Sequence, residues 1–91
     1  MNHKVIKLSA PIEAHGETIS ELNLSTPTGD QVCRIGMPYS VSEDGDANLN
    51  MKKVKSYLIE LCGIPASSVD KMSPSDLNNA AWGVAGFFLK G

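Results

Sequence analysis

The chain has 91 residues, of which 42% are hydrophobic and 20% are charged, and its formal net charge is −2. This length and composition predict one small folded domain over residues 1–91 and argue against intrinsic disorder. The negative charge gives no electrostatic basis for holding DNA or an anionic membrane, so we expect no nucleic-acid partner and no membrane partner.

Two segments in the first quarter of the chain predict a β-hairpin over residues 4–24. Residues 4–8 and 17–24 place apolar side chains on one face with imperfect alternation. Pro11 is expected to end the first strand, and His15-Gly16 supplies a turn in which glycine can take a positive φ. Because a lone hairpin is marginal in water, we expect helices to pack against it.

A short helix is predicted over about residues 28–36. The segment Thr26-Pro27-Thr28-Gly29-Asp30 has a hydroxyl cap, an early proline and an acid near the positive end of the helix dipole. Gly36-Met37-Pro38 is expected to end this helix. Residues 40–48, which include Ser42-Glu43-Asp44-Gly45-Asp46, are interpreted as a polar acidic loop.

The acidic loop begins like a calcium-binding loop but does not continue as one. Asp44, Asp46 and Asn48 follow the expected spacing, whereas Leu49 and Lys55 stand where such a loop requires glycine and glutamate. We therefore predict no metal site there. Motifs for nucleotide cofactors, nucleophilic catalysis and paired carboxylates are also missing from the sequence, so we expect no cofactor and no enzymatic activity.

Two longer helices are predicted in the second half of the chain. Met51, Val54, Leu58 and Leu61 recur at helical spacing and indicate a helix over residues 50–62, which Gly63 caps. Residues 64–69 are interpreted as a one-turn helix or a tight bend. Ser73-Pro74-Ser75-Asp76 resembles a capping box and begins a helix over residues 73–89. The predicted fold class is therefore α+β, a hairpin followed by three helices in the order ββααα.

The last predicted helix has more apolar surface than a small domain can cover. Residues 80–89 contain no charged and no strongly polar side chain, yet this run of ten is shorter than the roughly 20 residues that cross a bilayer. A helix that is apolar on every side must be covered on every side, so part of this surface is expected to meet another chain. Gly83 and Gly86 indicate either a close approach of another backbone or an adaptable helix end.

The two cysteines, Cys33 and Cys62, are interpreted as reduced structural residues, each on an apolar helix face. The first seven residues lack the long apolar core and the cleavage site of a signal peptide. We therefore expect the protein in the cytoplasm.

Residues that resemble a known family lie in both halves of the chain. They are Leu8-Ser9-Ala10-Pro11-Ile12, residues 16–24, Thr26-Pro27-Thr28-Gly29-Asp30, Leu61-Cys62-Gly63-Ile64-Pro65, Val69, Asp76 and Phe87-Phe88-Leu89. With these features the chain resembles the short tail assembly chaperones of Mu-like contractile-tailed phages and prophages, over nearly its whole length.

The resemblance implies a small helper protein that acts in the cytoplasm of the bacterial host. Members of this family are thought to bind apolar stretches of the phage tape measure protein until tail tube subunits polymerise around it, and they leave before the tail is complete. Apolar helix faces would bind in a groove, without a cofactor. The predicted partner-binding residues are Met51, Leu58, Met72, Trp82, Val84, Phe87 and Phe88.

Three alternatives remain open at this point. The chain could be a structural tail protein that stays in the virion, or a small DNA-binding regulator that uses the lysines of residues 52–55. The apolar terminal run could also form an interface between copies of the chain, as a homo-oligomer.

Overall fold

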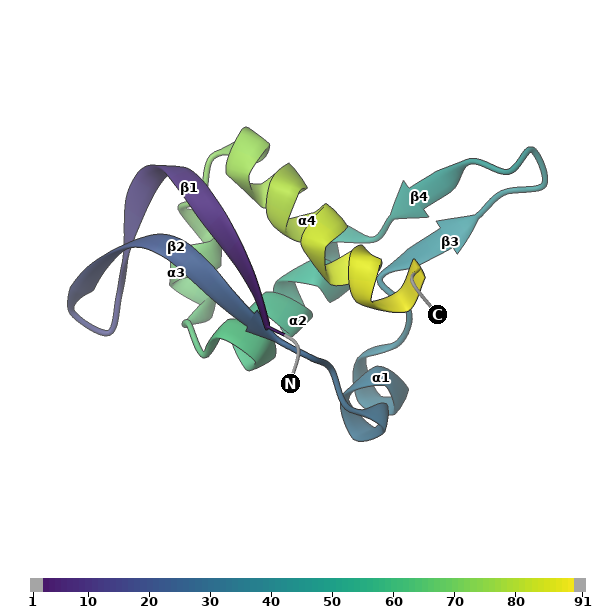
Figure 1. Cartoon of the computed structure of the whole chain (residues 1–91), viewed down its shortest axis with the longest axis horizontal. Helices are drawn as coiled ribbons and strands as arrows, with labels where there is room; N and C mark the ends of the chain where they lie inside the picture. Colours follow the sequence, from purple (N-terminus) through teal and green to yellow (C-terminus); the bar gives the residue numbers. More distant parts are fainter. Residues whose placement is uncertain (1–2, 90–91) are drawn as a thin grey trace.

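The computed structural model describes residues 3–89, which form two antiparallel strand pairs and four helices (Figure 1). The α+β class and the N-terminal hairpin are confirmed, but the predicted order ββααα lacked two short strands and one helix. The elements are β1 (His3–Ala14), β2 (Glu17–Ser25), α1 (Gly29–Ile35), β3 (Tyr39–Val41), β4 (Ala47–Leu49), α2 (Met51–Cys62), α3 (Ala66–Asp70) and α4 (Pro74–Leu89).

A bulge interrupts the first strand where the sequence predicted its end. The expectation that Pro11 ends this strand is wrong, because β1 continues beyond it. The register runs from Lys7 opposite Glu21 to Ile12 opposite Ile19, so residues 8–11 of β1 face a single residue of β2. Proline is tolerated there because a bulge does not need its missing backbone N–H.

The acidic segment is a second hairpin rather than a simple loop. Tyr39 pairs with Leu49 and Val41 with Ala47, and Gly45, with φ of +89°, closes the turn between them. We call residues 39–49 the arm, because Figure 1 shows that β3 and β4 project away from the rest of the molecule. Sequence analysis missed these strands because each has three residues, too few for an alternating pattern to be recognised.

Helix α1 lies on the surface, and Thr28 provides its hydroxyl cap. Gln31 N donates to Thr28 Oγ1 at 3.2 Å, and Thr28 N donates to Gln31 Oε1 at 2.9 Å, which completes a capping box. None of its residues is buried, so the expectation that Cys33 lies on a covered apolar face is wrong. Arg34 connects α1 to α2 through paired hydrogen bonds to Glu60.

The longer helices lie close to their predicted positions. Asn50 caps α2 by accepting from Lys53 N, and Gly63 ends it in the left-handed region with φ of +71°. Pro74 is the first residue of α4, and Ser73 Oγ accepts from Asp76 N at 3.1 Å. Within residues 3–89, neither α4 nor any other helix combines the length and the apolar character needed to cross a membrane.

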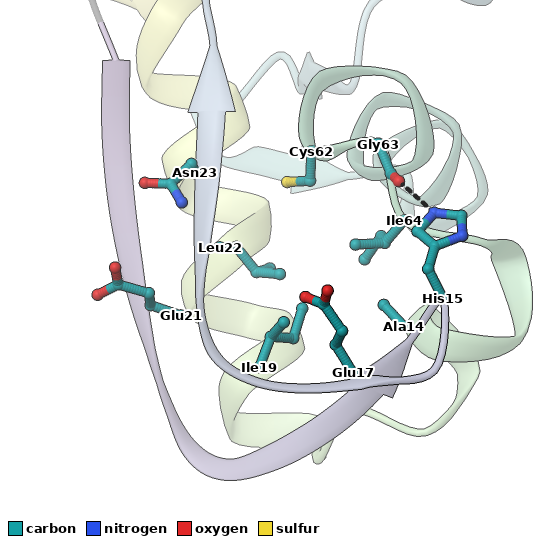
Figure 2. Close-up of a pocket in the computed structure, with 10 residues that line it drawn as sticks. All are labelled: Ala14, His15, Glu17, Ile19, Glu21, Leu22, Asn23, Cys62, Gly63 and Ile64. Carbon is teal, nitrogen blue, oxygen red and sulfur yellow. Dashed lines mark hydrogen bonds between the residues drawn. The ribbon is translucent and has the colours of Figure 1, made fainter.

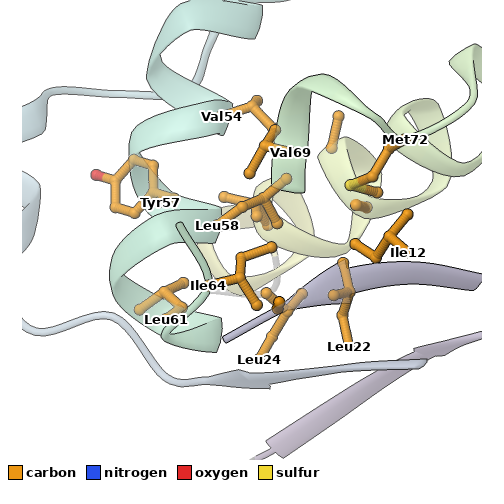
Figure 3. Close-up of a cluster of buried hydrophobic side chains, with 14 residues drawn as sticks. Ile12, Leu22, Leu24, Val54, Tyr57, Leu58, Leu61, Ile64, Val69 and Met72 are labelled. Carbon is orange, nitrogen blue, oxygen red and sulfur yellow. The ribbon is translucent and has the colours of Figure 1, made fainter. Parts of the chain in front are cut away.

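The core lies between the inner face of the β1–β2 hairpin and the three helices α2, α3 and α4 (Figure 3). Leu22 and Leu24 contribute from β2, and α2 contributes a stripe of four buried side chains. Tyr57 is completely buried within this stripe, and its hydroxyl donates to Gly36 O at 2.7 Å. This bond ties the end of α1 to the core.

Replacement of Tyr57 by phenylalanine should lower the free energy of unfolding by about 1 kcal/mol, because Gly36 O loses its buried donor. Urea denaturation followed by circular dichroism measures the change. Tyr39→Phe is the matched control: its ring also lies against Phe88, and its change should stay within about 0.5 kcal/mol. Equal destabilisation by the two variants would contradict the assignment of the Tyr57 bond.

Candidate functional site

The apolar helix α4 is anchored at its first turn by a buried carboxylate. Asp76 is 2% exposed, and both of its carboxylate oxygens accept from Ser9 N, at 2.9 and 3.0 Å. Ser9 Oγ donates to Oδ2 at 3.1 Å, and Ala10 N adds a longer bond of 3.4 Å. These donors belong to the β1 bulge, whose backbone groups are free from the ladder.

The environment of Asp76 favours its ionised form. The backbone hydrogen bond from Ser9 lowers the pKa of the carboxyl most, and the bonds from Ser9 Oγ, Ala10 N and Ser73 act in the same direction against desolvation. The negative charge also lies at the N-terminal end of α4, where the helix dipole stabilises it. The first turn of α4 is thereby fixed on β1.

One side of α4 approaches the hairpin closely at Gly83. A Cβ atom built there would lie 2.9 Å from Ile6 Cδ1 and 3.3 Å from Leu24 Cδ1, so a larger residue would require the ends of these side chains to shift. Lys4 Nζ donates to Gly83 O at 2.9 Å and lies 4.3 Å from the centre of the Phe87 ring. The close approach expected at the glycines is therefore made by the protein's own β1 and β2.

Another side of α4 packs on α2 and on the base of the arm. The Phe88 ring lies edge-on to Tyr57, with centroids 5.7 Å apart, and edge-on to Tyr39 at 6.4 Å. Val84 is completely buried one turn earlier. Because Phe88 contacts both tyrosines, the end of α4 holds the base of the arm against α2.

The remaining side of α4 is left open. Ser75, Asn78, Trp82 and Leu89 recur at spacings of three, four and seven residues and are all exposed, so they share one face of the helix. We call these four residues the outer face of α4. Trp82 is 44% exposed and Leu89 is 54% exposed. Large apolar side chains at such exposure on an anchored helix are available to a partner.

The predicted partner-binding residues fall into two groups. Leu58 and Val84 are completely buried and Met72 is 7% exposed, so these three belong to the core and present no surface to a partner. Met51 and Trp82 are exposed, whereas Phe87 and Phe88 are half-buried through the contacts described above. The sequence pattern could not separate the core side of these helices from the outer side, and Met72 lies between α3 and α4, outside both helices.

Three further apolar residues are exposed that the sequence pattern did not indicate as partner-binding residues. Leu89 completes the outer face of α4, and its spacing of seven residues from Trp82 was the available signal. Val41 on the arm is 60% exposed, and Val5 on β1 is 51% exposed. Met37, in the segment that ends α1, is exposed at 43%.

A shallow pocket of about 310 Å³ lies at the other end of the molecule, between the β1–β2 turn and the end of α2 (Figure 2). His15, with φ of +54°, places its Nε2 atom 2.9 Å from Gly63 O. Cys62 lines the pocket, and partial burial raises the pKa of its thiol to about 12. A thiol that stays protonated near neutral pH is a poor nucleophile and a poor metal ligand.

Among residues 3–89 no three histidine, cysteine, aspartate or glutamate side chains converge on a position that could hold a metal ion. The candidate functional site is therefore α4, because the packing of this helix leaves apolar side chains exposed on one face.

Comparison with known protein families gives a match over most of the chain. The family model described as "Phage tail assembly chaperone proteins, E, or 41 or 14" matches residues 5–89, which include every helix and nearly all of the hairpin. No curated protein and no solved structure matches the chain.

Replacement of Asp76 by asparagine should lower the melting temperature by several degrees at neutral pH. The native pKa lies below the ordinary aspartate value of 3.8, so the stabilisation is present above that value and is lost as the pH falls through the native pKa. Thermal denaturation of both proteins across this range should show their melting temperatures converge in acid.

The control for this comparison is Asp70→Asn, which removes a surface ion pair with Lys55 and should change the melting temperature little. A difference between wild type and Asp76→Asn that stays constant from neutral pH into acid would contradict an ionised anchor.

Replacement of Gly83 by alanine should destabilise the protein by about 1 kcal/mol, because the clash with Ile6 and Leu24 outweighs the gain of about 1 kcal/mol in helix propensity. Gly86→Ala is the matched control in the same helix. Its Cβ would meet only the flexible end of Lys4, so its unfolding free energy should stay within about 1 kcal/mol of wild type. Chemical denaturation gives both values, and the reverse order of stabilities would refute the close approach at Gly83.

Proposed function

The chain belongs to the family of phage tail assembly chaperones, and we propose that it binds apolar helical segments of the tape measure protein during tail assembly. The matched residues 5–89 include the anchor at Asp76 and the whole of α4. The family match supports a role in tail assembly. The tape measure protein, as the specific partner, is our proposal.

The observation that carries this proposal is the outer face of α4. Asp76 and Gly83, seven residues apart, lie on one side of the helix and fix that side on β1, while Trp82 and Leu89 remain exposed. An apolar helix of a partner could lie along this face in the helix-in-groove mode. Tryptophan is the residue type that most often dominates the binding energy of such contacts.

The contact would be reversible, as a temporary helper requires. Burial of Trp82 and Leu89 would stabilise the complex by a few kcal/mol for each side chain, against the entropy cost of association. Such binding can shield an apolar segment, and the complex can still dissociate when tail tube subunits cover that segment. The half-buried Phe87 and Phe88, together with Met51, would extend the contact at its edges.

We place this activity in the cytoplasm of the bacterial host, before the tail is complete. The rival role is a structural protein retained in the virion, which would also need an exposed apolar surface. Mass spectrometry of purified particles separates the two roles: a chaperone is absent from finished tails, whereas a structural protein is present in fixed copy number.

Co-expression with the tape measure protein encoded nearby tests the proposal. Wild type should keep that protein soluble and co-purify with it, and the double variant Trp82→Ala/Leu89→Ala should bind about 100-fold more weakly. Val5→Ala is the matched control, since Val5 is an apolar residue with 51% exposure on β1, and this variant should bind normally. Equal binding by all three proteins would show that the outer face of α4 is not the binding surface. Absence of binding by folded wild type would overturn the proposal.

A further inference from the structure

The arm has two unpaired strand edges. Within the described residues β3 and β4 pair only with each other. Asn50 N donates to Pro38 O and Ser42 N donates to Asp46 O, both at 2.8 Å, so the inward hydrogen bonds belong to even-numbered residues. By the alternation of an antiparallel ladder, the backbone groups of Tyr39 and Val41 point outward on one edge, and those of Ala47 and Leu49 on the other.

Apart from the shortness of the two strands, these edges lack the features that usually keep an exposed strand apart from another chain. Natural edges carry lysine, glutamate, proline or a bulge within the strand, whereas Tyr39-Ser40-Val41 and Ala47-Asn48-Leu49 contain none of them. An isolated two-stranded hairpin is marginally stable in water. The arm would gain hydrogen bonds and covered apolar surface from further strands.

Opposite charges lie at the two ends of the arm. Glu43, Asp44 and Asp46 are at its tip, and Lys52 and Lys53 follow its base in the first turn of α2. None of these five side chains forms an ion pair with another described residue, whereas the neighbouring Lys55 pairs with Asp70 at 2.6 Å. The charges of the tip and the base are therefore available to a partner.

We propose that the arm is a dimerisation element, in which β4 pairs antiparallel with β4 of a second copy about a two-fold axis at Asn48. Antiparallel pairing places the acidic tip of each arm beside the base of the other arm, so Glu43 and Asp44 approach the first turn of the second copy's α2, which carries Lys52 and Lys53. The outward groups of Ala47 and Leu49 provide the hydrogen bonds.

The charge distribution of the arm favours a second copy of the chain as its binding partner. The acidic tip would be stabilised by a basic surface that lies beside an unpaired strand. The chain itself carries such a surface at the base of the arm. A two-fold axis satisfies both ends at once, because each tip meets the other copy's base. The resulting four-stranded sheet would also join the faces that carry Val41 and Leu49 into one apolar surface.

Charge reversal tests the proposal with the full chain. Size-exclusion chromatography with light scattering at low ionic strength should give wild type twice the monomer mass of 9.7 kDa. Glu43→Lys/Asp44→Lys places positive charge at both ends of the arm, and Lys52→Glu/Lys53→Glu places negative charge at both ends. Each variant should be monomeric because the tip of one copy then repels the base of the other copy.

Mixing the two reversed variants should restore a dimer of one copy of each, since positive tips then meet negative bases. The control is Glu17→Lys/Glu21→Lys on β2, which changes the formal net charge from −2 to +2, as the tip reversal does. It should stay dimeric. A monomeric wild type, reversed variants that both remain dimeric, or a mixture that fails to combine would each overturn the proposal. Circular dichroism checks that every variant is folded.

Discussion

The buried carboxylate of Asp76 is the interaction on which the arrangement of the helices depends. Its oxygens accept from Ser9 and Ala10 in the bulge of β1, at the point where the ladder with β2 leaves backbone donors without strand partners. The bulge therefore needs an acceptor, and the apolar helix needs a fixed first turn. One aspartate supplies both, because it is the third residue of α4 and its charge is favourable at a helix N-terminus.

Once its first turn is fixed, α4 has three distinct sides. Gly83 allows the helix to lie close to Ile6 on the hairpin, and Phe88 packs against α2 and the base of the arm. The outer face with Trp82 and Leu89 is what remains. In the proposed function this face takes the tape measure segment, and arm pairing would bring two such faces into one assembly and raise the effective concentration along a long partner.

The sequence predicted the features that have strong local signals. Helical spacing and caps located α2 and α4, and the turn at His15-Gly16 located the β1–β2 hairpin. It could not predict that β1 continues past Pro11, because the bulge is stabilised by Asp76, more than sixty residues away. It also could not separate Leu58 and Val84 from Trp82, since an apolar helix has no polar stripe to mark its outer side until its neighbours are placed.

The proposed function requires that the outer face of α4 stays exposed until the partner covers it. Trp82 is the single tryptophan, so its fluorescence reports on that face alone. In the free protein the emission should lie at the long wavelength of a tryptophan in contact with water, in line with its 44% exposure. Titration with an apolar helical segment of the tape measure protein should shift the emission to shorter wavelength and saturate. Binding demonstrated by calorimetry without any shift would contradict the account.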